Sequence, residues 1–185
     1  MIINMTETVF NKLICLCQSS KRELSGVINT IVDDEEIYVL DFKLDDNLLI
    51  KSSNSHEIVF NKSEYITKII YEPMLTNNQI YIRFHTHPMF NKASTLSKAD
   101  IDSLKYIQCL SKKITKNDHK NYTKIIEGII SNSEIAFYTY DLDSNSIVRL
   151  PLFCDGMEII PSSEKNIFQI FNEAFSKGIK LTKKL

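Results

Sequence analysis

Two of the four histidines in this chain of 185 residues stand together in the tetrapeptide His85-Thr86-His87-Pro88. Residues 80–84, directly before them, are apolar or aromatic except for Arg83 and predict a strand. Side chains at positions i and i+2 of a strand point to the same side, so both imidazoles would project toward one point, as two zinc ligands must. Pro88 cannot continue a strand ladder and places the pair at a strand end, open to a site. Two surface imidazoles on an edge strand are the alternative.

A carboxylate that could complete this ligand set stands in Ser97-Lys98-Ala99-Asp100, before an apolar helical pattern. Ser-x-x-Asp is also the signature of a helix-capping box. The two interpretations are compatible, because a side chain in the first turn of a helix can lie near the cap and also face a cleft. If the loop over 89–96 folds back, Asp100 completes a set of two histidines and one carboxylate. That set leaves a fourth zinc position for water, which is typical of a catalytic zinc.

A hydrolytic zinc site also needs a general base that is not a ligand. Glu23 is the best candidate, because it stands where the polar residues Lys21 and Arg22 give way to an apolar strand pattern. This position would put its carboxylate at the edge of the core, where burial raises the pKa of a carboxyl group toward neutrality. An ordinary solvated carboxylate beside two basic residues is the alternative.

These motifs, taken together and in order, resemble a known family. Glu23 before a strand, then His85-Thr86-His87-Pro88, then Ser97-x-x-Asp100 at a helix start are similar to the JAMM motif of the MPN+ (JAB-domain) metalloproteases of bacterial or phage type. That motif reads Glu, His-x-His-Pro and Ser-x-x-Asp. The resemblance covers residues 23–104 by motif and extends to about residue 153 by the order of the elements.

The resemblance implies a role for each of these residues. One catalytic zinc ion would be bound by His85, His87 and Asp100. Glu23 would activate the water, and Ser97 would help to stabilise the tetrahedral intermediate. Nine residues separate His87 from Ser97, two more than is usual in the family, and we interpret the longer loop as a surface variation.

The hydropathy pattern predicts an α/β (α+β) fold, with a mixed, mostly antiparallel sheet flanked by helices. Residues 1–160 are expected to form one JAB/MPN-like domain, on which a C-terminal helix and basic tail, residues 161–185, would pack. Strands are expected over 27–32, 37–44, 57–60, 80–84, 125–130, 134–140 and 147–153. Helices are expected to begin after caps near residues 4–6, 63, 97 and 162, the second of them ending at Pro73.

Composition narrows the classes of function. With 22 basic and 23 acidic residues the formal net charge is -1, which argues against a nucleic-acid-binding surface. No stretch approaches the ~20 apolar residues of a membrane helix, and no secretory signal is present, so we expect a cytoplasmic protein that does not bind membranes. The pair Cys15 and Cys17 lies in a helical apolar pattern, which favours buried thiols over metal ligands.

The resemblance implies a zinc isopeptidase or peptidase that cleaves after the C-terminal tail of a ubiquitin-like protein, by deconjugation or by trimming of a precursor. Partners would be that protein or its conjugate and E1- and E2-like enzymes of the same operon, as in antiphage defence operons. The strand before His85 is a candidate edge for gripping an extended tail. Met89 and Phe90 are candidates for docking the folded domain, unless they pack under their loop.

Other classes of function remain open at this point. An MPN-like scaffold without catalytic activity would bind partner proteins only. Another zinc hydrolase could process a sulfur carrier or belong to the DNA-repair-associated JAB proteins, and a metal-dependent nuclease or small-molecule hydrolase could reuse the same ligands. Metal content and a panel of substrates would separate these classes.

Overall fold

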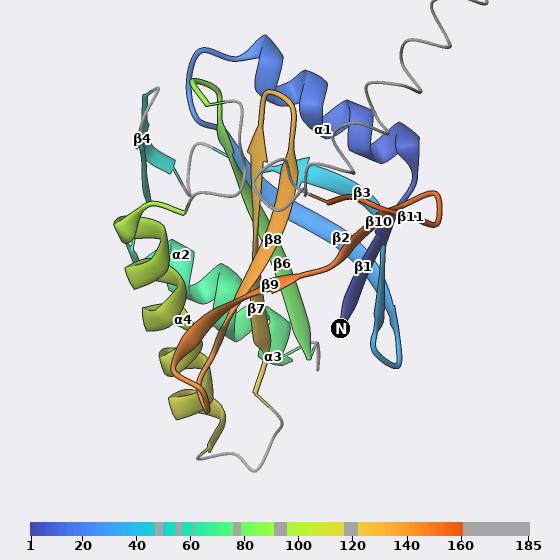
Figure 1. Ribbon diagram of the computed structural model, residues 1–185. Helices are drawn as coiled ribbons and strands as arrows, with labels where there is room; N and C mark the ends of the chain where they lie inside the picture. The colour runs from blue at the N-terminus through green and yellow to red at the C-terminus, as the bar shows by residue number, and fades with distance from the viewer. Residues whose placement is uncertain are drawn as a thin grey trace, which may run out of the picture.

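The structure is a computed structural model, and it describes residues 1–46, 50–54, 57–60, 62–75, 79–90, 96–116 and 122–160. A strongly curled sheet forms its centre, with helices against both faces (Figure 1). The expected mixed α/β architecture is therefore confirmed. In the described part of the chain, no helix is both long enough and apolar enough to cross a membrane.

Nine strands form the large sheet in the order β11-β10-β1-β3-β2-β6-β7-β8-β9. They are β1 Ile2–Met5, β2 Ser25–Asp33, β3 Glu36–Leu44, β6 Ile80–His87, β7 Lys124–Ser131, β8 Ile135–Asp141, β9 Ser146–Leu150, β10 Leu152–Cys154 and β11 Met157–Glu158. Strand β1 is parallel to β3 and β10, and β6 is parallel to β7, while the other neighbours are antiparallel. A second, two-stranded sheet pairs β4 Ile50–Ser53 with β5 Ile58–Phe60.

The helices are α1 Glu7–Ser19, α2 Lys62–Ile66, the π-helical turn η1 Thr67–Tyr71, α3 Glu72–Leu75 and α4 Lys98–Lys116. Of the two expected caps for α1, Thr6 is the one used, because its side chain accepts a hydrogen bond from the backbone N–H of Val9. The expectation for the cysteine pair is half right. Cys17 is buried in the core, whereas Cys15 is exposed.

Several element boundaries differ from the sequence-based prediction. Pro73 does not end its helix. The N–H of Glu72 donates to the carbonyl of Thr67 and completes the π-helical turn. Pro73 then lies in the first turn of α3, where a backbone N–H is not needed. The expected strand over 147–153 is split at Pro151 into β9 and β10. Strands β1, β4 and β11 were not predicted. The expected terminal helix and tail, 161–185, lie outside the described residues.

Alternation along β7 explains how the helices cover the sheet. This strand is buried along almost its whole length and reads as an apolar run. Ile126 and Ile130 belong to the core cluster on the α1 side, whereas Ile125 and Ile129 belong to the cluster on the α4 side. The same alternation in β6 sends Phe84 to the α1 side, which leaves His85 and its i±2 neighbours for the other face.

A glycine allows β2 and β6 to lie close together at this point. Gly26 pairs with Phe84, and a Cβ atom on Gly26 would lie 2.7 Å from Cε1 of that ring and 2.2 Å from the carbonyl oxygen of Lys43. No side chain fits there. The glycine therefore lets the ring of Phe84 fill the core while His85, the next residue, faces the opposite side of the sheet.

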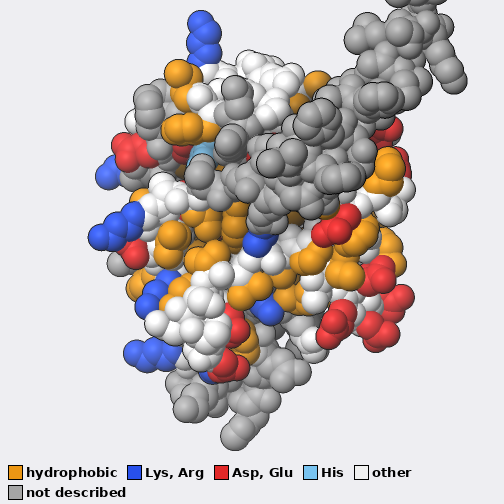
Figure 2. Space-filling model, in the orientation of Figure 1, with side chains coloured by type: hydrophobic (Ala, Val, Ile, Leu, Met, Phe, Trp, Pro, Cys, Tyr) orange, Lys and Arg blue, Asp and Glu red, His pale blue; other side chains and the backbone are white. Residues whose placement is uncertain are grey.

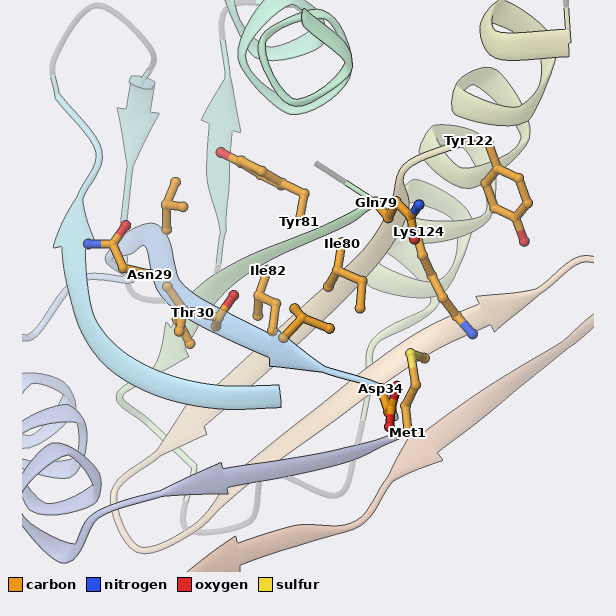
Figure 3. A pocket seen from close by; sticks show the side chains of 13 residues that line it. Met1, Asn29, Thr30, Asp34, Gln79, Ile80, Tyr81, Ile82, Tyr122 and Lys124 are labelled. Atoms are coloured by element: carbon orange, nitrogen blue, oxygen red, sulfur yellow. The ribbon is translucent and has the colours of Figure 1, made fainter. Parts of the chain in front are cut away.

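Strands β2 and β6 part beyond this point. They are paired only from Ser25 with His85 to Ile28 with Ile82, after which β2 continues with β3 and β6 with β7. A hollow of about 890 Å³ lies where they diverge. Side chains of β2, including Asn29 and Thr30, and side chains from the start of β6, including Ile80, line it (Figure 3).

Candidate metal centre

Strand β6 brings His85 and His87 to one point. Both are buried, and their Nε2 atoms lie 2.9 Å apart. The strand ends at His87, directly before Pro88, as the sequence predicts. His85 and His87 are each only 7% exposed, and the face shown in Figure 2 has a small area of histidine at its surface.

Asp100 joins the pair from the first turn of α4. Its Oδ1 lies 3.4 Å from His85 Nε2 and its Oδ2 lies 3.9 Å from His87 Nε2. The same residue also forms the capping box. The backbone N–H of Ser97 donates to Asp100 Oδ2 at 2.8 Å, and the backbone N–H of Asp100 donates to Ser97 Oγ at 3.2 Å. The two interpretations of Ser-x-x-Asp thus hold together, because the cap fixes the carboxylate that faces the histidines.

These three side chains fit a single metal ion. Their ligand atoms all lie within 4.8 Å of one another. Donors bound to one tetrahedral zinc ion at ~2.1 Å lie roughly 3.4 Å apart. The two Nε2 atoms are 2.9 Å apart, and Asp100 Oδ1 lies 3.4 Å from His85 Nε2, which is close to that value. Two imidazole nitrogens 2.9 Å apart, with a carboxylate beside them, are donor atoms of the kind that bind divalent cations. In the described part of the chain this is the one group of histidine, cysteine and acidic residues so arranged.

A residue that the motifs did not indicate orients the first ligand. Glu127, buried in β7, lies with its Oε1 2.7 Å from Nδ1 of His85. A carboxylate accepts there, so Nδ1 carries the proton and Nε2 keeps its lone pair for a metal. Glu127 in turn lies with Oε2 2.8 Å from Nε of Arg83. Arg83 and Glu127 are directly opposite each other in the parallel pair β6 and β7.

Glu23 is buried just before β2, with 5% of its surface exposed. Two contacts hold its backbone: its N–H donates to the carbonyl of Asn54 at 2.7 Å, and Ser53 Oγ donates to its carbonyl at 2.5 Å. The next residue, Leu24, exchanges hydrogen bonds of 2.8 Å with Thr86, between the two histidines. Its side chain lines the same cavity as His85, His87 and Asp100, and its carboxylate interacts electrostatically with His85 and Asp100.

Four titratable side chains of this site have shifted pKa values, which are raised for Glu23 and His85 and lowered for His87 and Asp100. Burial raises the pKa of Glu23 to about 7, and the nearby Asp100 carboxylate adds to the rise while His85 opposes it. Burial lowers the pKa of His87 to about 4, and the neighbouring His85 lowers it further. Burial alone would raise the pKa of Asp100, but its hydrogen bond to His85 and the capping bonds from Ser97 hold it well below its usual value. Burial would lower the pKa of His85, yet its contacts with Asp100 and Glu127 raise it.

All these residues open on one cavity. Its volume is about 360 Å³, and the lining residues are Glu23, Glu57, Ile58, Phe60, Tyr65, Arg83, His85, His87, Phe90, Ser97, Ala99, Asp100, Ser103 and Glu127. Ser97 is exposed at the rim. A ligand in the cavity would therefore meet the metal ligands, the buried glutamate and the hydroxyl together.

Met89 and Phe90, the two candidates for docking a folded domain, differ in their position relative to the cavity. Met89 is 63% exposed and does not line the cavity, whereas Phe90 is 49% exposed and places its ring 5.7 Å from the ring of His87. Asn132, in the turn between β7 and β8, holds their loop by donating from Nδ2 to the carbonyl of Pro88 at 2.7 Å and from its backbone N–H to the carbonyl of Phe90 at 3.1 Å. Both apolar side chains are therefore exposed.

One expectation about this region is wrong. Strand β6 is not an edge, because β2 pairs with it on one side and β7 pairs with it along its whole length on the other. Its backbone has no free row of hydrogen-bonding groups at the histidines. An extended peptide cannot add to the strand that carries them.

The comparisons with known proteins bear on the fold. No protein-family model matches this chain, and no curated protein matches its sequence. Among solved structures, the chain is similar to the solution structure of protein DSY2949 from Desulfitobacterium hafniense. The two chains are 14% identical, and the match covers 83% of this chain and 93% of that one with a TM-score of 0.50. At this identity the likeness shows a shared fold.

Proposed function

We propose that this protein is a zinc-dependent peptidase or isopeptidase of the JAMM (MPN+) type, acting in the cytoplasm on the C-terminal tail of a ubiquitin-like protein. One observation carries the proposal: the ligand atoms of His85, His87 and Asp100 meet within 4.8 Å in the cavity that a buried, non-ligating Glu23 also lines. A metal ligand set with a separate carboxylate base is the minimum that metal-assisted hydrolysis of an amide needs.

Each residue then has a chemical role. His85, His87 and Asp100 would hold a zinc ion, which would supply a Lewis acid for the scissile carbonyl and for water. Glu23 would take a proton from the water as its hydroxyl adds to the acyl carbon, and would then deliver that proton to the leaving nitrogen as the C–N bond breaks. Its pKa of about 7 suits both steps near neutral pH. Ser97 Oγ accepts from the Asp100 backbone, and its own O–H would be the donor that supports the oxyanion.

The proposed partners are a ubiquitin-like protein and the E1- and E2-like enzymes that would act with it. An exposed apolar pair beside the cavity mouth, Met89 and Phe90, is the proposed docking surface for the folded domain. Substituting both with Asp should raise KM for a full-length fusion more than for its tail peptide. Equal losses on both substrates would remove the docking role from this loop.

A cleavage assay on defined fusions tests the function. Ubiquitin-like proteins, each with a short C-terminal extension, are incubated with the zinc-loaded protein, with the chelated protein and with chelated protein to which zinc is restored. We expect cleavage after the ubiquitin-like tail, lost on chelation and recovered with zinc. Stoichiometric zinc with no cleavage of any fusion, or undiminished cleavage by the metal-free protein, would contradict the proposal. Single-stranded DNA and RNA serve as controls for a nuclease.

A further inference from the structure

Arg83 is a cation buried in the wall of the metal cavity. It stands two residues before His85 on β6, so its side chain leaves the same face of the strand. It is only 6% exposed, and it lines the cavity of about 360 Å³ together with the metal ligands. Arginine is rarely buried to this extent unless its charge and its donors are paired.

The pairing of Arg83 is incomplete. Its Nε lies 2.8 Å from Glu127 Oε2, which balances the charge, but the N–H is not directed at that oxygen as a hydrogen bond requires. Nη1 is buried and, like Nε, has no hydrogen-bond partner among the residues that the structure describes. The other neighbours are ring faces. The guanidinium carbon lies 4.9 Å from the ring centroid of Phe60 and 4.6 Å from that of Tyr65.

A guanidinium has five N–H donors in a planar fork, and a buried donor without a partner is costly. The acceptor that fits this fork best is a carboxylate, which can take two parallel N–H donors. Ring faces offer no oxygen, so a carboxylate that moves them aside exchanges cation–π contacts for stronger charge-assisted hydrogen bonds. The unfilled donors therefore point to an anionic ligand that enters through the cavity.

We propose that Arg83 forms a carboxylate subsite of the metal cavity, which receives the free C-terminal carboxylate of a leaving group one or two residues long. This inference rests on the proposed function and names its substrate more closely. Positions i and i+2 of a strand are ~6.6 Å apart, and an extended peptide advances ~3.5 Å per residue. A scissile carbonyl held at the histidines thus puts a carboxylate beside Arg83 after one or two residues.

The subsite favours trimming of a precursor over deconjugation. In an isopeptide bond the leaving group is a lysine side chain of a folded protein, whose α-carboxyl group is itself in a peptide bond and carries no charge. A short C-terminal extension ends in a charged carboxylate. A cavity of about 360 Å³ is near the lower end of the size range of ligand pockets, which suits a small leaving group.

A binding experiment on the metal-free protein tests the subsite apart from catalysis. N-acetylglycylglycine and its C-terminal amide have the same shape and differ in charge, and calorimetric titration gives the dissociation constant of each. We expect the acid to bind about 10-fold or more tightly than the amide, the scale of a charge-assisted hydrogen bond. Metal-free protein is used because a bound metal ion would itself attract the acid.

Three variants assign the preference to Arg83. The double variant Arg83→Met, Glu127→Gln removes both charges of the buried pair and should bind acid and amide equally, with near-UV circular dichroism verifying its fold. Glu127→Gln alone keeps the cation and should keep the preference, as should the control Arg22→Met, which changes an exposed arginine outside the cavity. Equal binding of acid and amide by the wild type, or an unchanged preference in the double variant, overturns the subsite.

The outcomes also separate this inference from the proposed function. If the zinc-loaded protein cleaves no fusion while the acid preference depends on Arg83, the subsite stands and the peptidase function falls. If fusions are cleaved while the preference is missing, the function stands and the subsite falls. Cleavage rates of fusions that end in a free or an amidated extension give the same comparison under turnover.

Discussion

The two ends of β6 carry hollows of opposite character. At its start, where β2 leaves it, the hollow of about 890 Å³ is lined by side chains of mixed type, with Lys124 and Asp34 as its charged members (Figure 3). At its end, the cavity of about 360 Å³ is lined by two histidines, a buried arginine and the four carboxylates of Glu23, Glu57, Asp100 and Glu127. The smaller cavity is therefore the one in which titratable side chains converge.

The difference comes from how the sheet is built. Where β2 and β6 separate, they no longer pair with each other, and space opens between them. Where β2, β6 and β7 remain paired, strand alternation aligns Arg83, His85 and His87 on one face, and Glu127 faces them from the next strand. Volume alone is therefore a poor guide to the site in this protein, and the convergence of titratable side chains is the better one.

Removal of the ligands should have the largest effect. We expect the wild type to bind about one zinc ion per chain, and the double variant His85→Ala, His87→Ala should lose both this zinc and hydrolysis. The fold should survive, because β6 is held by β2 and β7 and the core clusters contain neither histidine. Metal analysis after dialysis measures the zinc content, and far-UV circular dichroism verifies the fold. Full zinc occupancy in this variant would break the assignment.

Glu23→Gln should come next. Gln keeps the shape of the side chain and removes proton transfer, so turnover should fall by about 10² to 10⁴-fold. Zinc content should not change, because Glu23 is not among the three ligands. Steady-state kinetics and metal analysis of the same preparation check both. A wild-type rate would mean that another acid is the base, and Glu57, which lines the same cavity, would be the next to test.

Glu127→Gln should have a smaller effect, on metal affinity. Residues that orient a metal-bound histidine typically contribute ~10 to 100-fold to affinity. The amide can still accept from His85 Nδ1 through its oxygen but loses the charge that balances Arg83 at 2.8 Å. Competition with a chromophoric chelator gives the zinc dissociation constant. An unchanged constant would show that β7 only supports the cavity wall.

The motif residues could be predicted because their cues are local. The same-side placement of His85 and His87 follows from strand alternation, and Asp100 follows from a helix start. Glu127 is 42 positions from His85, and only the parallel pairing of β6 and β7 brings it there. Parallel partners are not specified by any local pattern, so this contact lay beyond the sequence argument.

A cue for that pair was nevertheless present. Arg83 is the one charged residue of the strand expected over 80–84, and Glu127 is the one charged residue of the strand expected over 125–130. Two such charges of opposite sign in apolar strands favour a buried pair. The expectation that β6 is an edge strand was wrong, although a local cue against it was also present. Its apolar run was typical of a strand buried on both sides, as the structure has it.

Stability should respond to pH through Glu23. Below pH 4.5 its carboxyl is protonated in the folded and unfolded chain alike, and between pH 4.5 and about 7 only the unfolded chain releases the proton. Glu23 therefore contributes a loss of stability as pH rises through that window, and Glu23→Gln lacks this contribution. In metal-free protein the variant should match the wild type at pH 4.5 and melt a few degrees higher at pH 8, for an effect of about 1 kcal/mol. A Tm difference that is independent of pH would contradict the raised pKa.

The smallest effect is expected in the larger hollow. Asn29 and Gln79 line it and are exposed, so Asn29→Ala and Gln79→Ala should change stability by less than about 0.5 kcal/mol. Zinc affinity and turnover should stay within about 2-fold, because these side chains lie toward the start of β6 and the proposed ligands lie at its end. The two hollows have no lining residue in common. Thermal unfolding, zinc titration and kinetics on the same preparations measure all three. If either variant lowered turnover as strongly as Glu127→Gln lowers zinc affinity, the two ends of β6 would be coupled, and the larger hollow would have to be treated as part of the site.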